Sequence, residues 1–180
     1  MQETRRLLQA AAALSAALAA QSIPHAFHGS VLTAALAGTP LADEIFCIVE
    51  GGPPHAHPFR RARDALAAEP DFTATHSPWT NRCIEILPAG EAGPRHLDAA
   101  TVMQVQGVPF LTVSEFIRAK LKAWAIRGAE RDAQDIAYVL VRFWNRVDIN
   151  RVPEADMALF VARNPTAAPA WAAVRRKYGM

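Results

Sequence analysis

The order of the periodic patterns constrains the fold more than any other feature of this sequence. Short apolar runs typical of strands occupy roughly the first 110 residues, and helical spacing dominates the rest. The strand-like runs are PHAFH, EIFCIVE, DFTATHS, NRCIEILPAG and a hairpin around Gly107. This order predicts an α+β protein, with an α/β core over residues 1–112 and a helical region over residues 113–180 packed on it as one compact unit.

Helical spacing is clearest in the second half. The segment SEFIRAKLKAWAIRG predicts a helix that Ser114 caps and Gly128 ends, and two short helices are expected in PEADMALFVARNP and PAWAAVRRKY. In the first half, SVLTAALAG predicts a short helix that Ser30 caps and Gly38 ends, and PFRRARDALAAEP a surface helix. The longest pattern, AERDAQDIAYVLVRFWNRVD, has one continuous apolar stripe, made of Ile136, Val139, Leu140, Phe143, Trp144 and Val147.

The N-terminal segment MQETRRLLQAAAALSAALAAQS has two interpretations. Arginines followed by an Ala/Leu run and ALAA are typical of a secretory signal. Glu3 and Gln9 interrupt that profile, and apolar residues recur at helical spacing, which favours a folded first helix. Because the secretory signal is disfavoured, we expect a cytoplasmic protein. No apolar stretch is long enough to span a bilayer convincingly, so we expect no membrane partner.

The composition is that of a globular, soluble protein, with 51% hydrophobic and 20% charged residues. A net charge of +2 gives no argument for a nucleic-acid partner, and we interpret the basic end VRRKYGM as solvated. Cys47 and Cys83 lie in apolar strand-like runs, which favours buried free thiols and leaves a disulfide as the open alternative. Without zinc-ligand spacing, a structural zinc site is not expected. His55 and His57 have a spacing that can hold a metal ion, but their Pro/Gly-rich loop favours a solvated surface.

The junction at Gly29 and Ser30 is a candidate anion site. Glycine lets a phosphate approach the backbone, and the first amides of the following helix carry the positive end of its dipole. The hydroxyl of Ser30 can add a hydrogen bond, and His28 would lie at the same site. The same residues are also an ordinary way to begin a helix, so both interpretations stay open.

Two glutamates lie in strand-like runs. Glu44 begins EIFCIVE, and Glu85 lies within CIEILP. A carboxylate among apolar strand residues either points outward or is paired. If the two strands are neighbours, both carboxylates can meet at one end of the sheet and bind Mg²⁺. Otherwise each faces solvent.

The cations and acids of the helical half form a second cluster of candidates. Lys120 lies on the flank of the apolar stripe of its helix, and Arg127 follows on the same side. Together they can hold phosphates, cover apolar surface or pair with acids. Asp132 and Asp135 begin the next helix, where helix capping, or contact with Lys120 or Arg127, would explain them.

Taken in order, these segments resemble the nucleotidyltransferase-like superfamily. The closest likeness is to small proteins related to abortive-infection-type toxin nucleotidyltransferases, including fungal members. The matching segments are FHGS, EIFCIV, IEILP and FLTVSEFIRAKLKAWAIRGAERDAQDI, which together span roughly residues 5–145. The resemblance implies a mixed sheet flanked by helices, a C-terminal helical half, Mg²⁺ with ATP or another nucleoside triphosphate, and nucleotide transfer to an acceptor hydroxyl.

The resemblance also implies roles for individual residues. It places Glu44 and Glu85 as the first and third acids, which hold the metal. It gives phosphate and nucleotide contacts to Gly29, Ser30, Lys120 and Arg127. It leaves Asp132 and Asp135 to brace the site.

The sequence departs from the family pattern at the second acid, which falls on Phe46. Phenylalanine cannot bind a metal, and two-metal transfer needs carboxylates that bridge both ions. We therefore expect the scaffold with an altered site for a small molecule or nucleotide. Three functions fit: Mg²⁺-dependent nucleotide transfer through Glu44 and Glu85; a pseudo-enzyme that binds a ligand or protein; or acid/base chemistry on an apolar small molecule, as in secondary metabolism. In the last case Phe46 would line the pocket and Glu44, Glu85 or His28 would move protons.

Overall fold

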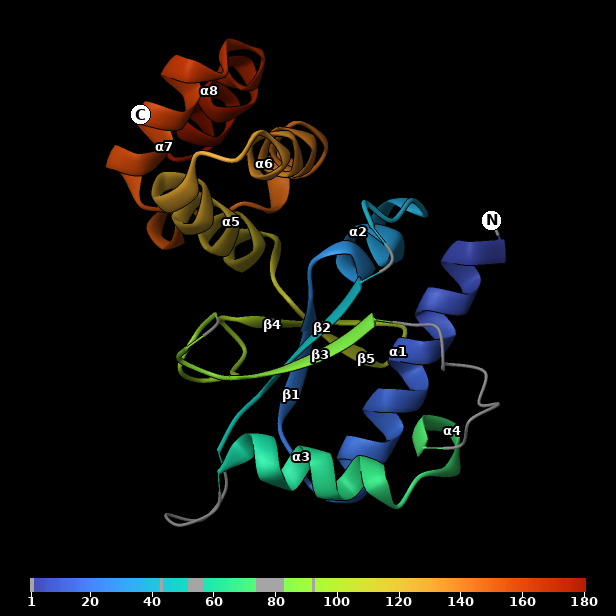
Figure 1. Ribbon diagram of the computed structural model, residues 1–180. Helices are drawn as coiled ribbons and strands as arrows, with labels where there is room; N and C mark the ends of the chain where they lie inside the picture. The colour runs from blue at the N-terminus through green and yellow to red at the C-terminus, as the bar shows by residue number, and fades with distance from the viewer. Residues whose placement is uncertain (1, 43, 52–56, 74–82, 92) are drawn as a thin grey trace. The chain divides into compact units, whose positions relative to one another are not determined.

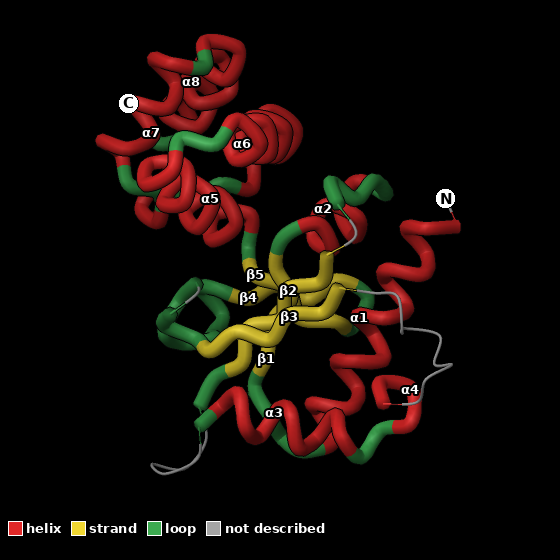
Figure 2. Tube along the Cα trace, in the orientation of Figure 1, coloured by secondary structure: helices red, strands yellow, loops and turns green. Residues whose placement is uncertain are grey.

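The computed structural model describes residues 2–42, 44–51, 57–73, 83–91 and 93–180. The chain divides into two compact units, Met1–Leu111 and Thr112–Met180. All strands of the described residues belong to the first unit, where they form a mixed five-stranded sheet (Figure 2). The predicted α+β class is therefore confirmed.

The first unit combines the sheet with four helices in its described part. In chain order the elements are α1 (Gln2–Ala20), β1 (His25–His28), α2 (Ser30–Ala37), β2 (Glu44–Val49), α3 (Pro58–Ala67), α4 (Pro70–Thr73), β3 (Cys83–Pro88), β4 (Val102–Val105) and β5 (Val108–Leu111). The strand order is β3-β2-β1-β5-β4. Strand β1 runs antiparallel to β2 and parallel to β5, and β2 runs parallel to β3. Strands β4 and β5 form the predicted hairpin.

The central strands bury most of one face of the sheet. Phe27 of β1 pairs with Cys47 of β2 and also with Phe110 of β5, so these three side chains share a face. Helices α1 and α3 contact the sheet and each other, and α3 crosses one end of α1 (Figure 1). Cys47 is a free, fully buried thiol, and burial raises its pKa, as expected for an inert structural cysteine.

The opposite face of the sheet is covered in part by the loop between β3 and β4. Ala26, Ile48 and Leu111 form a buried cluster, against which Ala89 and Leu97 of the loop pack. The carboxylate of Glu50 accepts a hydrogen bond from the Leu97 backbone N–H at 2.9 Å. The cluster and this bond fix the loop over one part of the face.

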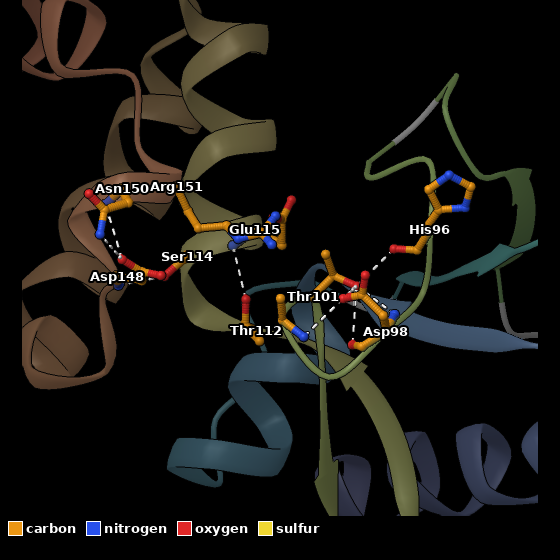
Figure 3. A network of polar contacts seen from close by, with 10 residues as sticks. His96, Asp98, Thr101, Thr112, Ser114, Glu115, Asp148, Asn150 and Arg151 are labelled. Atoms are coloured by element: carbon orange, nitrogen blue, oxygen red, sulfur yellow. Dashed lines mark hydrogen bonds and ion pairs between the residues drawn. The ribbon is translucent and has the colours of Figure 1, made fainter.

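Side-chain hydrogen bonds also hold the loop in shape. Oε1 of Glu50 lies 3.0 Å from Nδ1 of His96. The Thr101 hydroxyl donates to the carbonyl of His96 at 2.9 Å and accepts from the Asp98 N–H at 3.0 Å (Figure 3). The loop is thus ordered by its own turn chemistry.

Helix α1 buries the apolar stripe that its spacing predicts, with Leu7, Leu14 and Leu18 each 1% exposed or less. It is tied to β1 through the imidazole of His25, which is 2.7 Å from the Ser15 hydroxyl and 2.8 Å from the Ile23 carbonyl oxygen. Among the described residues, no helix combines the length and the apolar character needed to cross a bilayer.

The second unit is helical throughout its regular structure. Its elements are α5 (Val113–Arg127), α6 (Glu130–Phe143), the 3₁₀ turns η1 (Trp144–Arg146) and η2 (Ile149–Arg151), α7 (Glu154–Arg163), the 3₁₀ turn η3 (Pro165–Ala167) and α8 (Ala168–Lys177). The helices pack around a core that includes Ile117, Leu140 and Phe160. The rings of Trp124 and Phe160 meet edge to face at 5.1 Å between centroids.

Two of the expected secondary-structure assignments are wrong. The first part of DFTATHS, predicted as a strand, lies in helix α4, because Pro70 at its first position favours a helical start. Residues 74–82 lie outside the described residues. Helix α6 ends at Phe143, so the stripe does not continue as one helix, and Trp144 is 37% exposed. Lys177 Nζ donates to the carbonyls of Asn145 and Val147, which satisfies the backbone there without further helix.

Both predicted serine caps are also wrong. Gly29 is the N-cap of α2, and Ser30 is its first helical residue. Thr112 caps α5 by accepting from the Glu115 N–H at 3.3 Å, whereas the Ser114 hydroxyl accepts from the distant Asp148 N–H at 2.8 Å (Figure 3). A threonine two residues earlier in the chain thus takes the cap position, and Ser114 is left free to bond outside its helix. The predicted helix ends are confirmed, since Gly38 and Gly128 both have left-handed backbones at the C-caps.

Candidate functional site

Four candidate residues of the first unit lie on one face of the sheet. His28 of β1 pairs with Phe46 of β2, and Phe46 pairs with Glu85 of β3. Paired residues share a face, and side chains two apart along a strand point the same way. His28, Phe46 and Glu85 therefore form a row across three strands, with Glu44 beside it on the same face.

The two glutamates come from neighbouring parallel strands. Glu44 pairs with Cys83, so Glu85 stands two residues further along β3, diagonal to Glu44. Glu44 is half-buried on an inner strand, whereas Glu85 is exposed on the edge strand β3. The condition for a shared site, neighbouring strands and a common face, is met.

The glycine turn at the end of β1 contacts the middle of this row. Gly29 has φ 82° and ψ −142°, a backbone conformation that side chains strongly disfavour. A Cβ atom built on Gly29 would lie 2.9 Å from Cδ2 of Phe46. The phenyl ring thus lies against the turn, at the position where the family resemblance implies the second acid.

The candidate cations of the second unit are paired with its candidate acids. Lys120 Nζ lies 2.8 Å from Asp135 Oδ2 and 3.7 Å from Asp132 Oδ1. Arg127 donates two hydrogen bonds to the Asp132 carboxylate, from Nε at 2.6 Å and from Nη2 at 2.8 Å. The structure therefore brings all four residues into one network between α5 and α6.

Electrostatics in this network favour the charged forms. The Asp132 side chain is 2% exposed, and the hydrogen bonds from Arg127, helped by the charges of Arg127 and Lys120, lower its pKa against the opposing effect of burial. The same hydrogen bonds raise the pKa of Arg127. Two cations and two anions neutralise one another, which leaves no excess positive charge here for a phosphate.

Three polar contacts between residues distant in the chain had no signal in the sequence. Glu115, whose side chain is 2% exposed, pairs with Arg151 at 3.2 Å across 36 residues of chain. The Ser15–His25 bond joins a helix to a strand, and the Ser114 hydroxyl receives the N–H of a distant turn. Of the proposed histidine pair, His57 caps α3 by accepting from the Phe59 N–H, and His55 lies outside the described residues.

A solved structure has a similar fold. The crystal structure of an antigenic nucleotidyltransferase-like protein from Paracoccidioides brasiliensis aligns with a TM-score of 0.63 over 92% of this chain and 92% of that chain, at 13% sequence identity. This chain has a nucleotidyltransferase-like fold. No protein-family model matches the chain, and no curated protein matches it significantly. At this identity the likeness shows the fold alone.

The described residues of this chain do not supply a complete set of metal ligands. Within the residues that the structure describes, no three His, Cys, Asp or Glu side chains are grouped so that they could hold an ion. Phe46 adjoins both glutamates, Glu44 along its own strand and Glu85 on the neighbouring strand, and its ring lies against the turn. These residues do not fit a two-metal centre, which needs bridging carboxylates. Magnesium and a nucleoside triphosphate stay predictions.

Proposed function

We propose that this protein is a ligand-binding member of the nucleotidyltransferase-like fold that does not carry out two-metal nucleotide transfer. The observation that carries the proposal is the contact between Phe46 and Gly29. A ring within van der Waals reach of the turn backbone replaces both the second carboxylate and the space that a phosphate would need beside the glycine.

The residues around Phe46 suggest the chemistry of the ligand. Phe46 is half-buried, so part of its ring is accessible and can pack against an apolar or aromatic group. Glu44 and Glu85, on the same face, offer carboxylate oxygens that accept hydrogen bonds. We expect a small molecule with an apolar body and hydrogen-bond donors at its edge.

The ion pairs of the second unit support the same conclusion. A triphosphate held by Lys120 and Arg127 would compete with the carboxylates of Asp132 and Asp135, which these cations already contact at 2.6 to 2.8 Å. Breaking a bidentate guanidinium–carboxylate pair is costly when the carboxylate is buried. The network therefore serves better as a brace within the helical unit than as a phosphate clamp.

The proposal is tested by measuring binding and turnover separately. Isothermal titration with ATP, GTP, CTP and UTP, with and without Mg²⁺, should show no metal-dependent affinity, and α-labelled nucleotides should give no transferred product. A fragment screen followed by NMR should find ligands whose binding Phe46→Ala weakens. Metal-dependent transfer that Glu44→Gln and Glu85→Gln both abolish would overturn the proposal.

Restoring the missing acid gives a sharper test. Phe46→Asp places a carboxylate next to both Glu44 and Glu85, and Phe46→Asn introduces a side chain of nearly the same size as Asp without its charge. Because carboxylates are the ligands that Mg²⁺ and Mn²⁺ prefer, the Asp variant should bind Mn²⁺ at least about tenfold more tightly than the Asn variant. Equal Mn²⁺ affinities would show that the row of residues on this face is not arranged around a metal position.

One observation favours a second candidate, metal-dependent transfer through a single ion. Glu44 and Glu85 lie on one face of neighbouring strands, as a shared ion would require. This candidate predicts that the unmodified protein binds Mn²⁺ and loses that binding in Glu85→Gln. The titrations above distinguish it from the first proposal.

A further inference from the structure

The net charge of the chain conceals an uneven distribution between its two units. Residues 1–111 carry 7 Lys and Arg against 10 Asp and Glu, a net charge of −3. Residues 112–180 carry 12 Lys and Arg against 7 Asp and Glu, a net charge of +5. An excess of this kind in a small helical unit attracts polyanions.

Part of the positive charge is used inside the second unit. Lys120 and Arg127 neutralise the two aspartates at the start of α6, and Arg151 pairs with the buried Glu115. The excess must therefore lie on other residues.

Four exposed arginines lie on the segments α6, η1 and α8, which contact one another where η1 meets the last turn of α8. Lys177 Nζ joins the two segments by donating to the Asn145 carbonyl at 3.0 Å and to the Val147 carbonyl at 2.8 Å. The Tyr178 hydroxyl lies 3.5 Å from the same Val147 oxygen. The exposed side chains around this junction, which we name the basic corner, are Arg142, Trp144, Arg146, Arg175, Arg176 and Tyr178.

The groups of the basic corner are available to a partner. In the part of the chain that the structure describes, none of the four arginines forms an ion pair with a carboxylate, and Arg142 instead lies over the Tyr138 ring at 5.3 Å. The nearby carboxylate of Asp148 accepts from the Asn150 N–H and lies 3.5 Å from the Tyr178 hydroxyl. Trp144 is 37% exposed and Tyr178 is 40% exposed.

We propose that the basic corner binds single-stranded nucleic acid without sequence preference. Guanidinium groups bind phosphates in a bidentate manner, and exposed aromatic rings stack on unpaired bases of any identity. An anionic membrane would attract the same arginines, but interfacial binding also needs a continuous apolar surface, and four of the six residues of the corner are charged. The proposal concerns a surface of the second unit and is independent of the ligand site around Phe46.

The test is fluorescence anisotropy of the full chain with labelled 20-nucleotide oligo(dT) and oligo(rU). Affinity should fall with salt at a log–log slope of about −3 if the four arginines each neutralise one phosphate. Arg175→Glu with Arg176→Glu should weaken binding at least about tenfold and make the slope shallower. The matched control, Arg5→Glu with Arg6→Glu on α1, changes the net charge equally and should weaken binding less than about threefold.

Stacking is tested at Trp144. Trp144→Ala should weaken oligonucleotide binding by at least about fivefold, whereas Trp144→Phe and the exposed control Leu159→Ala should keep most of it. Circular dichroism of every variant checks that the fold is intact. Absence of oligonucleotide binding would overturn the proposal, as would an equal loss of affinity in the α1 control and in the Arg175→Glu, Arg176→Glu variant. Equal affinity for a duplex of the same length would also overturn it, and so would binding to vesicles of 30% phosphatidylserine without binding to oligonucleotides.

Discussion

Phe46 packs so closely on Gly29 that no side chain could be added to the glycine without displacing the ring. The distance from a Cβ built at Gly29 to Cδ2 of Phe46 is 2.9 Å. Two parts of the chain that the family resemblance assigns to phosphate and metal binding are therefore in direct apolar contact. The conformation of the turn at Gly29 therefore depends on Phe46, the residue that stands where the family resemblance implies the second acid.

Gly29→Ala is expected to destabilise the protein for two reasons, backbone strain at φ 82° and the clash with Phe46. We expect the free energy of unfolding to fall by about 2–4 kcal/mol in urea denaturation. Gly38→Ala is the matched control, because Gly38 also has positive φ but nothing within 4 Å of its would-be Cβ. A smaller loss of unfolding free energy in Gly29→Ala than in Gly38→Ala would contradict the contact. In a double variant, adding Phe46→Ala should restore part of the stability that Gly29→Ala loses.

Asp132→Asn should destabilise the helical unit, because it leaves Arg127 and Lys120 facing a neutral amide. Hydrogen bonds to charged groups contribute more than neutral ones, so we expect a loss of at least about 1 kcal/mol in the free energy of unfolding. The control is Asp64→Asn in the pair with Arg63, whose side chains are 64% and 66% exposed, where the change should be close to zero. Equal effects at both positions would show that the network adds no more than an ordinary surface pair.

The lowered pKa of Asp132 also gives a pH dependence. A carboxyl that is more acidic in the folded state contributes stability above its unfolded pKa of about 3.9, and this stability is lost as pH falls through the lower folded pKa. Below about pH 4 the unfolding free energy should therefore fall more steeply in the unmodified protein than in Asp132→Asn. Parallel curves for the two proteins would refute the assignment.

His25 should make the first unit sensitive to mild acid. Its Nδ1–H donates to the Ile23 carbonyl and its Nε2 accepts from the Ser15 hydroxyl, while burial lowers its pKa. Stability should be full above the unfolded pKa of about 6.5 and should decline as pH falls below it, because the unfolded chain takes up the proton first. His25→Gln should flatten the decline between about pH 7 and 5 in thermal melts. The exposed His96→Gln serves as the control and should keep it.

Glu50→Ala should release the loop between β3 and β4. The variant loses the acceptor for the Leu97 N–H and the contact with His96, each worth on the order of 1 kcal/mol. Because Arg95 lies in this loop and is exposed, limited trypsin digestion should cleave after it at least about fivefold faster. Glu91→Ala, in the same loop, should leave the rate unchanged; a similar acceleration there would point to general loop loosening instead.

The sequence predicted the elements better than their ends or their contacts. Period-two and period-3.6 patterns are local, so strands β1, β2 and β3 and helices α5 and α6 were foreseeable. Caps depend on which of several nearby hydroxyls reaches the first amides of the helix, so Thr112 rather than Ser114 caps α5. Helix α6 ends at Phe143 and gives way to the 3₁₀ turn η1, and Lys177, 34 residues after Phe143, donates to the carbonyls of Asn145 and Val147, a contact that no local pattern announces.

The sequence alone determined which chemical groups are present: two glutamates in strand-like runs, a phenylalanine where a carboxylate would be needed, and a lysine, an arginine and two aspartates at helical spacing. Only the tertiary structure decided which of them meet. The pairing of β2 with β3 places Glu85 beside Phe46, and the ring of Phe46 packs against Gly29. The packing of α5 against α6 brings Arg127 within hydrogen-bond distance of Asp132. The reason is physical: side-chain identity is a local property, whereas register and packing are chosen by the burial of the whole sheet and of all the helices at once.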